Sequence, residues 1–504
     1  MVSQLLPLLV LVSALSPSGA TSSTDLASAA SASFQVDLLG VRHPFAQPWE
    51  GCIGSGHASL SLRADWRAHL ARCAQELGVR RVRFHGLMDD DMSTSLGLGQ
   101  PSYVNLDSLI DYTASIGVTP LFELGFMPSW LASDPDNTSM HYKGIVSPPR
   151  NYSQWGEVME DLARHMLTRY GEETVSTWLL EVWNEPNGGF WTGFPKQSTY
   201  FKLYKETADA FGRVSPRFQI GGPATAGCPG WIEDLKNFTS STNTTMSFAS
   251  CHVYGGGSDP ASVGVVSAVV DSLPQAKTLA GDIPLIITEW SSSWMYTVPF
   301  HDEPGSAAFI AATAAAASGL ADVMSYWTFS DVFEEGGMLP GSFHGGFGLL
   351  TVHGTPKPAY RAFQLLHQAG GARLNVTKEA GGCGDVNLLA LVNSSAATLF
   401  IYNHLISGQA GSNCTASIHL GAAAPPGLLM SAKVARIDAA NANPKAAFLA
   451  LGAPEYPTAE QLAQLEIAST PVWMPLHVDG HVAGTSFELM VPGHGLAVVS
   501  MPLI

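Results

Sequence analysis

The chain is poor in positive charge. Its 504 residues include 25 Lys and Arg against 42 Asp and Glu, which gives a formal net charge of −17 at pH 7. The densest basic stretch is VRRVR, at residues 79–83. Nucleic acids and anionic membrane surfaces are bound through clustered Lys and Arg side chains. The composition therefore predicts neither as a partner, and it leaves the oligomeric state open.

Cysteine is also scarce. The six cysteines include no C-x-x-C pair, and the sequence contains no H-E-x-x-H motif. We therefore expect no metal site, no cofactor and no redox chemistry. A disulfide between Cys383 and Cys414 is expected, because both lie in the C-terminal region and an oxidising compartment permits the bond. Cys73, on a helix face, and Cys251, beside His252, are expected to be buried thiols.

The apolar run near the N-terminus, Leu5 to Leu15, is shorter than the ~20 residues that a membrane-spanning helix needs. Small residues follow it up to Ala20, which is typical of a secretory signal peptide over residues 1–20; an uncleaved anchor is the alternative. Seven asparagines begin N-x-[ST] sequons, where a random sequence would give roughly two. These features predict a glycoprotein that is secreted or lumenal, in an extracellular, vacuolar or lysosomal compartment.

Apolar extended runs alternate with amphipathic segments over residues 45–372. One amphipathic face holds Trp66, Leu70, Cys73 and Leu77, and Pro358 suits the first turn of a later helix. Eight such strand and helix units predict a (β/α)₈ TIM barrel. The extended runs lie near residues 51, 79, 118, 178, 218, 248, 284 and 323.

The pattern changes after residue 372 to short alternating runs separated by turn residues. This pattern predicts an appended C-terminal β-sandwich over residues 373–504. Residues 33–44 are expected to add an N-terminal strand to that sandwich. Residues 21–32 are small and polar, and we expect them to form a disordered linker.

Two carboxylates end apolar strands, Glu185 in WNEP and Glu289 in ITEW. A strand interior that is buried on both faces has no place for an unpaired carboxylate. In a TIM barrel the carboxyl ends of the strands build the active site, so the pair points to chemistry. By contrast, a lone histidine such as His85 is as often structural as functional, and the acidic run at 89–91 is more typical of a solvated loop.

Paired carboxylates suit glycoside hydrolysis, in which one carboxyl donates a proton to the leaving oxygen and the other attacks the anomeric carbon. Asn184 can hydrogen-bond the sugar 2-hydroxyl. His252 and Tyr254, at alternate positions of strand six, are expected to orient the nucleophile. Aromatic rings that can stack on sugars are expected to wall the pocket: Trp183, Trp191, Trp290, Trp294 and Trp327.

These residues resemble glycoside hydrolase family 39, the β-xylosidase and α-L-iduronidase family. WNEPN resembles its acid/base segment and ITEW its nucleophile segment; VRFHGLMDDDM, FELGFMPSWLAS and YWTFSDVFEEGG extend the resemblance. It implies a retaining exo-glycosidase with Glu185 as acid/base and Glu289 as nucleophile. The implied sugar-contacting residues are His85, Asp89, Asn184, Phe190, His252, Tyr254, Trp327 and Glu335, with the choice between Glu334 and Glu335 left open.

The expected substrate is an oligosaccharide or glycoside with a terminal β-D-xylosyl residue. Residues 326–356 contain no Lys or Arg, which weighs against the carboxylate of an iduronide. Trp327, Phe329 and Phe333 are expected to exclude a C5 substituent by bulk. Alternatives are an iduronidase-like enzyme, a glucosidase or mannan-type relative, or an inactive carbohydrate-binding protein.

Trp290 and the glycine-rich loop after strand six depart from the β-xylosidase pattern, and we expect both at the pocket rim.

Overall fold

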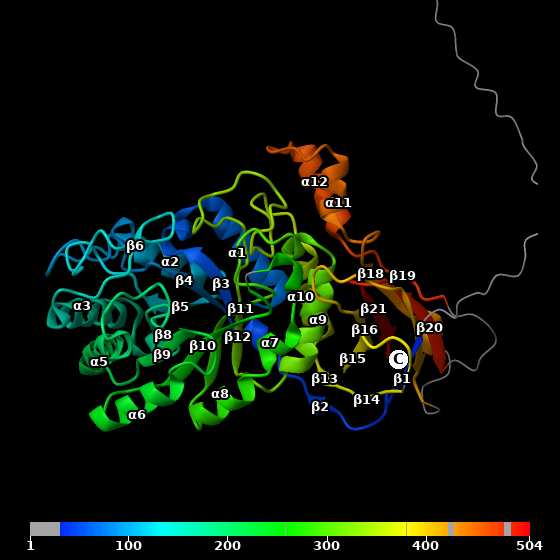
Figure 1. Cartoon of the computed structure of the whole chain (residues 1–504), viewed down its shortest axis with the longest axis horizontal. Coiled ribbons are helices and arrows are strands. Elements are labelled where there is room, and N and C mark those ends of the chain that lie inside the picture. Colours follow the sequence, from blue (N-terminus) through cyan, green and yellow to red (C-terminus); the bar gives the residue numbers. More distant parts are fainter. Residues whose placement is uncertain (1–30, 258, 380, 422–427, 478–484, 504) are drawn as a thin grey trace, which may run out of the picture.

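The computed structural model describes residues 31–257, 259–379, 381–421, 428–477 and 485–503. The predicted signal peptide and most of the predicted linker lie outside the described residues. A barrel of alternating strands and helices lies beside a domain made of two further sheets (Figure 1). The predicted TIM barrel with an appended β-sandwich is confirmed. Among the described residues, no helix is long and apolar enough to cross a membrane.

The barrel is closed, and its strands are parallel to their neighbours in the order β10-β11-β12-β3-β4-β5-β8-β9. All eight predicted strands are present, and their carboxyl ends meet at one mouth. The strands are β3 (Ile53–His57), β4 (Arg81–His85), β5 (Thr119–Leu124), β8 (Leu179–Val182), β9 (Gln219–Ala226), β10 (Phe248–Tyr254), β11 (Leu285–Ser291) and β12 (Val323–Tyr326).

Helices follow every barrel strand. The predicted apolar face of α1 is buried at Trp66, Leu70, Cys73 and Leu77, and Pro358 opens α10 as predicted. A short hairpin, β6 (Thr138–Ser139) and β7 (Gly144–Ile145), lies between β5 and α3. The helices are α1 (Ala64–Leu77), α2 (Val104–Ser115), α3 (Tyr152–Tyr170), α4 (Glu172–Val175), α5 (Lys196–Val214), α6 (Ile232–Thr242), α7 (Val266–Val270), α8 (Leu273–Ala280), α9 (Gly305–Ala317) and α10 (Pro358–Ala369).

Helix α9 joins the two domains. Its sequence, GSAAFIAATAAAA, is apolar on every face, as in a helix covered on all sides. It packs against α10 of the barrel and against β16 and β21 of the sandwich. Small alanine side chains let these elements approach closely, so the apolar core of the barrel continues onto one face of the seven-stranded sheet, while the interior of the sandwich forms a second core.

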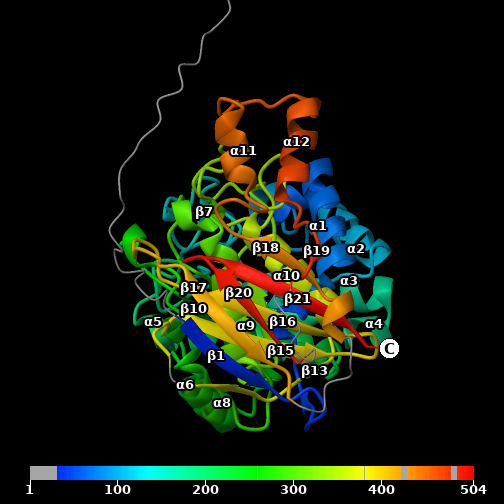
Figure 2. The ribbon, with the colours of Figure 1, turned by 90° about the vertical axis from the view of Figure 1, so that its right-hand side faces the viewer.

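The sandwich consists of a four-stranded sheet, β14-β1-β17-β20, and a seven-stranded sheet, β19-β18-β21-β16-β15-β13-β2. Strand β1 lies between β14 and β17, and Figure 2 shows it beside β17, so the N-terminal segment completes this sheet. It begins at Ser31, and the predicted disorder is therefore wrong for residues 31 and 32. The strands are β1 (Ser31–Val36), β2 (His43–Pro44), β13 (Ala372–Arg373), β14 (Val376–Lys378), β15 (Val386–Val392), β16 (Ala396–Asn403), β17 (Cys414–His419), β18 (Lys433–Ile437), β19 (Met474–Pro475), β20 (Ser486–Val491) and β21 (Leu496–Pro502).

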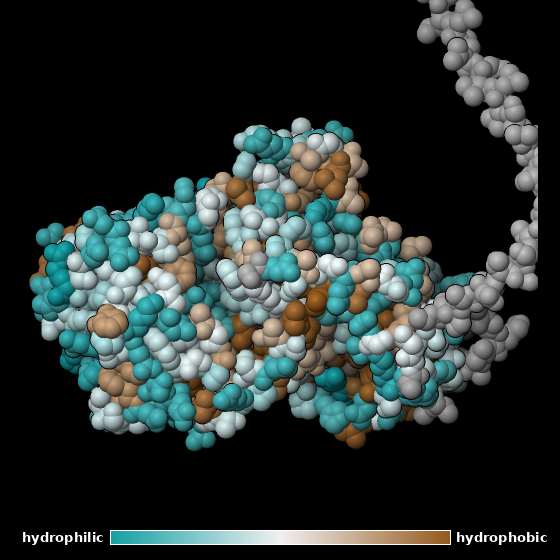
Figure 3. All heavy atoms as spheres, in the orientation of Figure 1, coloured by the Kyte–Doolittle hydropathy of each residue, from teal (hydrophilic) through white to brown (hydrophobic). Residues whose placement is uncertain are grey.

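Two helices interrupt the C-terminal region, which the sequence pattern predicted to be entirely β. Helices α11 (Pro444–Ala450) and α12 (Ala459–Ser469) form a protrusion (Figures 1 and 3). Thr458 caps α12 and forms a capping box with Gln461, which favours a helix start at this point. Phe448 and Leu465 pack on Phe343, so the protrusion rests on the long loop between β12 and α10.

The disulfide between Cys383 and Cys414 is confirmed, and Cys73 is a buried free thiol as predicted. The prediction for Cys251 is wrong, because Cys251 is bonded to Cys228. Strands β9 and β10 are neighbours in the barrel, which brings the two Cα atoms within 5.4 Å although 23 residues separate them in sequence.

Candidate active site

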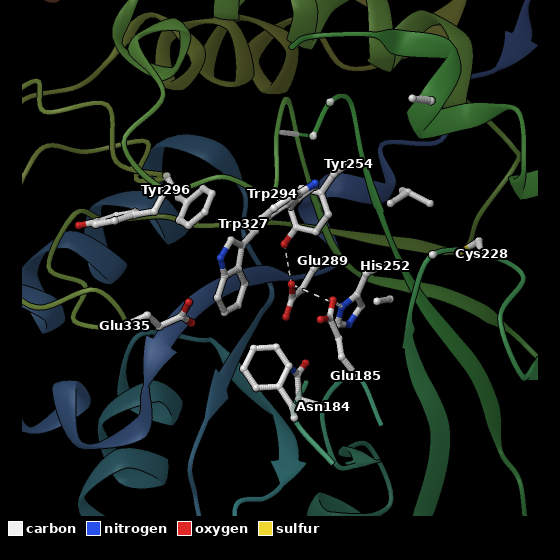
Figure 4. A pocket seen from close by; sticks show the side chains of 18 of the residues that line it. Asn184, Glu185, Cys228, His252, Tyr254, Glu289, Trp294, Tyr296, Trp327 and Glu335 are labelled. Atoms are coloured by element: carbon white, nitrogen blue, oxygen red, sulfur yellow. Dashed lines mark hydrogen bonds and ion pairs between the residues drawn. The ribbon is translucent and has the colours of Figure 1, made fainter. Parts of the chain in front are cut away.

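One cavity of about 900 Å³ opens at the mouth of the barrel. It has the size of a small-molecule site and lies where TIM barrels carry their chemistry. Glu185 and Glu289 reach it from β8 and β11 (Figure 4). Nine of the ten predicted site residues line it: His85, Asn184, Glu185, Phe190, His252, Tyr254, Glu289, Trp327 and Glu335.

A sharp backbone turn aims Glu185 into this cavity. Trp183 and Glu185 adopt left-handed backbone conformations, with φ of 69° and 40°. Such conformations are uncommon for residues other than glycine and cluster at functional sites. The backbone N–H of Glu185 donates to the carbonyl oxygen of Ala224 at 2.9 Å, which holds the turn against β9.

Hydrogen-bond donors and cationic groups surround Glu289. Arg83 Nη1 donates to its Oε1 at 2.8 Å, and the Tyr254 hydroxyl donates to its Oε2 at 2.5 Å. Burial raises the pKa of the Glu289 carboxyl, but the charges of His252, Arg83 and His85 and the Tyr254 hydrogen bond outweigh burial and lower it overall. The site therefore favours Glu289 as an ionised carboxylate.

Glu185 is the more exposed of the two carboxylates. Its Oε1 lies 2.8 Å from His252 Nδ1, whereas Glu289 Oε2 lies 3.4 Å from the same nitrogen. His252 thus makes its shorter contact with Glu185. Of His252 and Tyr254, which were both expected to orient the nucleophile, only Tyr254 hydrogen-bonds Glu289. Oxygen atoms of Glu185 and Glu289 lie within 4.8 Å of each other.

Asn184 and His85 are held by buried partners behind the cavity. Arg83 Nη2 donates to Asn184 Oδ1 at 2.8 Å, which fixes the orientation of the side-chain amide. His85 lies 2.5 Å from Glu123 and 3.3 Å from Glu335. Burial lowers the pKa of His85, but the two carboxylates outweigh burial and raise it to about 10. His85 is therefore a fixed cation at neutral pH.

The acidic pair at 334 and 335 splits between two environments. Glu335 lines the cavity, and burial raises its pKa. Glu334 instead lies 3.1 Å from His57 Nδ1, outside the cavity lining. Asp89, which was expected to contact the sugar, lies 3.0 Å from His57 Nε2 and does not line the cavity either. His57 draws both carboxylates away from the substrate space.

In the part of the chain that the structure describes, two groups of residues have atoms close enough to hold a metal ion: His57, Asp89 and Asp91, and Glu185, His252 and Glu289. In the first group, burial lowers the pKa of His57, but hydrogen bonds to Asp89 and Glu334 outweigh burial and raise it to about 9. A protonated imidazole has no lone pair for a metal. The arrangement is that of an imidazolium between carboxylates.

Three of the five tryptophans expected to wall the pocket lie in the core instead. Trp183 packs edge-on against Trp155 and Trp191, because the left-handed turn at residue 183 directs its ring away from the mouth. Trp290 packs against Tyr326 and is not at the pocket rim. Trp294 and Trp327 line the cavity.

The sequence interpretation missed several residues of the site. The most important is Arg83, whose guanidinium is buried and contacts Glu289, Asn184 and Glu181. Arg83 and His85 are two positions apart on β4 and therefore face the same side, which was a usable signal. Tyr296 and Phe347 also line the cavity, although they lie on loops where no period marks them.

The geometry agrees with a comparison to known families. The profile described as glycosyl hydrolases family 39 matches residues 34–482. The chain belongs to this family. A beta-xylosidase from Caldicellulosiruptor saccharolyticus is 39% identical over 448 residues, which cover 84% of this chain and 88% of the relative. A beta-xylosidase from Geobacillus stearothermophilus is 36% identical over 353 residues, covering 65% and 70%.

A solved structure supports the same assignment for this family 39 glycosyl hydrolase. The monomeric beta-xylosidase from Caulobacter crescentus CB15 superposes with a TM-score of 0.79 at 28% identity, covering 94% of this chain and 100% of that one. The similarity spans the barrel and the sandwich together. The protein is thus a glycoside hydrolase, and the paired carboxylates lie in its catalytic domain.

Replacing Tyr254 by Phe should move the acid limb of the pH–activity profile to higher pH. Glu289 has a lowered pKa, so activity that needs its ionised form is present above that pKa and lost as pH falls through it. Loss of the Tyr254 hydrogen bond should raise the limb by about one pH unit. The measurement is kcat/KM against pH. Tyr296→Phe, a cavity tyrosine without a hydrogen bond to Glu289, is the control and should leave the limb in place.

Proposed function

We propose that this enzyme releases terminal β-D-xylosyl residues by double displacement. The observation that carries the proposal is the approach of Glu185 and Glu289 to within 4.8 Å. Retaining glycosidases place their carboxyl groups about 5–5.5 Å apart, whereas inverting enzymes need about 6.5–9.5 Å to admit a water molecule. The short separation supports direct attack on the anomeric carbon.

The two environments support distinct roles. Glu289, whose pKa is lowered, attacks the anomeric carbon and forms a glycosyl-enzyme intermediate. Glu185, at the open side and beside His252, protonates the leaving oxygen, and then removes a proton from the water that hydrolyses the intermediate. Asn184 Nδ2 donates to the sugar 2-hydroxyl, a hydrogen bond that strengthens in the oxocarbenium-like transition state.

The preference for xylose is supported by what surrounds the glycone side. Trp327, Phe347 and Tyr296 line the cavity there, and Phe333 packs against them outside the cavity lining. Bulk at this position disfavours a hydroxymethyl group at C5, by roughly 1–3 kcal/mol for one excluded group. Among the described residues that line the cavity, none is Lys or Arg. Arg83 and His85, the nearest cations, are already paired with carboxylates, which disfavours an iduronide.

A panel of aryl glycosides tests this proposal. The aryl β-xyloside should be cleaved at least about tenfold better by kcat/KM than the aryl β-glucoside, and aryl iduronides should give negligible rates. Comparable rates on the glucoside, or a preference for the iduronide, would refute the xylosidase assignment. Chelator should leave the rates unchanged; a loss of activity would argue for a metal at Glu185, His252 and Glu289.

We also propose that the protein enters the secretory pathway and carries N-linked glycans. The sequons begin at Asn137, Asn151, Asn237, Asn243, Asn375, Asn393 and Asn413. Asn237, Asn243 and Asn413 are exposed, which suits glycan attachment. Asn393 Nδ2 instead donates to the carbonyl oxygen of Ala369 at 2.8 Å and is the least suited. Expression in a eukaryotic secretory host should give a protein whose mass falls after enzymatic removal of N-glycans, and an unchanged mass would contradict the proposal.

A further inference from the structure

The cavity has two chemically different sides, and the inference drawn here rests on the proposed function. In Figure 4, Glu185 and His252 lie between Trp327, Tyr296 and Glu335 on one side and Cys228 on the other. A glycosidase acid/base lies next to the oxygen that leaves. The side that holds Cys228 is therefore the side on which the leaving group, the aglycone, must lie.

On the side of Cys228 the cavity is lined by Ala226, Gly227, Cys228, Val253 and Ala268, and Trp294 lies nearer Tyr254 and Trp327 (Figure 4); we call these six residues the aglycone wall. None of these six side chains carries a charge. Ser272 adds a hydroxyl nearby, whereas the glycone side offers His85, Asn184 and Glu335. Polar recognition is therefore concentrated on one half of the cavity and is sparse on the other.

The backbone of the aglycone wall offers little more. Asn187 occupies both polar groups of Ala226, because its side chain accepts from the Ala226 N–H and donates to the Ala226 carbonyl, each at 2.9 Å. The Thr225 hydroxyl donates to the Gly227 carbonyl at 3.2 Å. The Ala226 N–H is therefore occupied before a ligand enters, and each of the two carbonyl groups has only its second lone pair left for a hydroxyl-rich aglycone.

Two further features, a disulfide and an exposed indole ring, add apolar surface to the wall. The disulfide between Cys228 and Cys251 joins the loop after β9 to β10, so the wall contains an uncharged disulfide where a free thiol would be weakly polar. Trp294 leaves 58% of its surface exposed, with its indole against Gly257, where a β-carbon would approach the ring nitrogen to 3.1 Å. An exposed indole over a glycine is a flat apolar surface that gains free energy when it is covered.

We propose that the natural aglycone is an apolar alcohol, with an alkyl or lipid-like body, and not a second sugar. A sugar bound there would lose water from several hydroxyl groups without gaining enough partners, which is costly. An alkyl group loses no hydrogen bonds and covers the wall. Glu185 donates its proton to the glycosidic oxygen and the alcohol leaves, as Glu289 bonds to the anomeric carbon and the glycosidic bond breaks; water, which gives a proton back to Glu185, then releases xylose from Glu289. No other reactant is needed.

A series of unactivated xylosides tests the proposal without the influence of a good leaving group. Methyl, butyl and hexyl β-D-xylosides share the same leaving atom and differ in apolar length. The value of kcat/KM should rise at least about tenfold from methyl to hexyl, because added methylene groups are buried on the wall. Hexyl xyloside should also be cleaved at least as efficiently as xylobiose. A flat series, or a clear preference for xylobiose, would overturn the inference.

A matched pair of variants locates the effect. Ala268 and Ser267 are both exposed neighbours on the short helix α7, and only Ala268 lines the cavity. Ala268→Asp should lower the hexyl-to-methyl ratio of kcat/KM at least about fivefold, because the alkyl chain would desolvate a carboxylate. Ser267→Asp, which adds the same charge outside the wall, should keep the wild-type ratio. Equal ratios in the two variants would place the alkyl chain elsewhere.

The outcomes separate this inference from the function on which it rests. Failure of the wild-type enzyme to cleave any β-xyloside would refute the proposed function and the inference together. Cleavage of methyl xyloside and xylobiose without a gain from chain length would refute the inference alone.

Discussion

Replacing Glu289 by Ala should abolish turnover of every β-xyloside, including activated aryl xylosides. Without the carboxylate no glycosyl-enzyme intermediate can form, and a good leaving group does not compensate for a missing nucleophile. We expect kcat/KM to fall by about 10⁴-fold or more. Glu157→Ala, an exposed glutamate on α3, is the control and should retain wild-type activity. Residual turnover within tenfold of wild type would show that Glu289 is not the nucleophile.

Replacing Glu185 by Ala should have a different signature. The first step should survive with an aryl xyloside, because a good leaving group needs no proton, whereas unactivated xylosides should lose about 10²–10⁴-fold in rate. Azide distinguishes the two variants. It should trap a β-xylosyl azide in Glu185→Ala, by attack on the intermediate, and an α-xylosyl azide in Glu289→Ala, by one inversion. The reverse stereochemistry would exchange the two roles.

The barrel and its paired carboxylates could be predicted because parallel strands impose a simple geometry. Every strand of a closed parallel barrel ends at the same mouth, so residues far apart in sequence converge there. Glu185 and Glu289 are 104 positions apart, and strand order alone brings them to one cavity. The hydrophobic periodicity and the number of strands were enough to predict that the two carboxylates converge, since neither depends on side-chain conformation.

The left-handed backbone conformations after β8 could not be predicted from the sequence, and they determine where the Trp183 ring packs. Trp183 and Glu185 stand two positions apart near the end of β8, yet the left-handed conformations there direct one ring into the core and one carboxylate into the cavity. A strict alternation would have placed both on one face. The disulfide between Cys228 and Cys251 could not be predicted either, because the sequence does not show that the loop after β9 folds back over β10.

Helix α12 was missed for another reason. Thr458 and Gln461 form the T-x-x-Q capping signal that precedes an apolar run, and the sequence contained it. The surrounding strand pattern dominated the interpretation, although a helical insertion between strands satisfies its own backbone hydrogen bonds and needs no place in either sheet. Local capping chemistry was therefore the better guide to residues 444–469.

Among the site residues that were not predicted from the sequence, Arg83 is the most important, because its guanidinium contacts four side chains at the base of the site. It donates to Glu181 at 2.6 Å, to Glu289 and to Asn184 at 2.8 Å, and lies 2.9 Å from Glu123. Burial lowers the pKa of this guanidinium, but Glu181, Glu123 and Glu289 outweigh burial and raise it. Arg83 is thus a permanent cation that the buried carboxylates require.

Arg83→Met should lower the free energy of unfolding by about 3–5 kcal/mol, because it leaves buried carboxylates without their counter-charge. Activity should fall as well, since Glu289 would lose the donor that favours its ionised form. Urea unfolding and kcat/KM are the two measurements. Arg81→Met, on the same strand but outside this cluster, is the matched control and should change both far less. Equal effects of the two substitutions would contradict the role assigned to Arg83.

Adding Glu181→Gln to Arg83→Met separates the structural role of Arg83 from its catalytic one. The double variant has one buried carboxylate fewer than Arg83→Met, so part of the lost stability should return. Activity should not return, because Glu289 and Asn184 still lack the guanidinium that orients them. If kcat/KM recovered in parallel with stability, Arg83 would serve the fold alone, and the charge balance of the nucleophile would depend on His252, His85 and Tyr254.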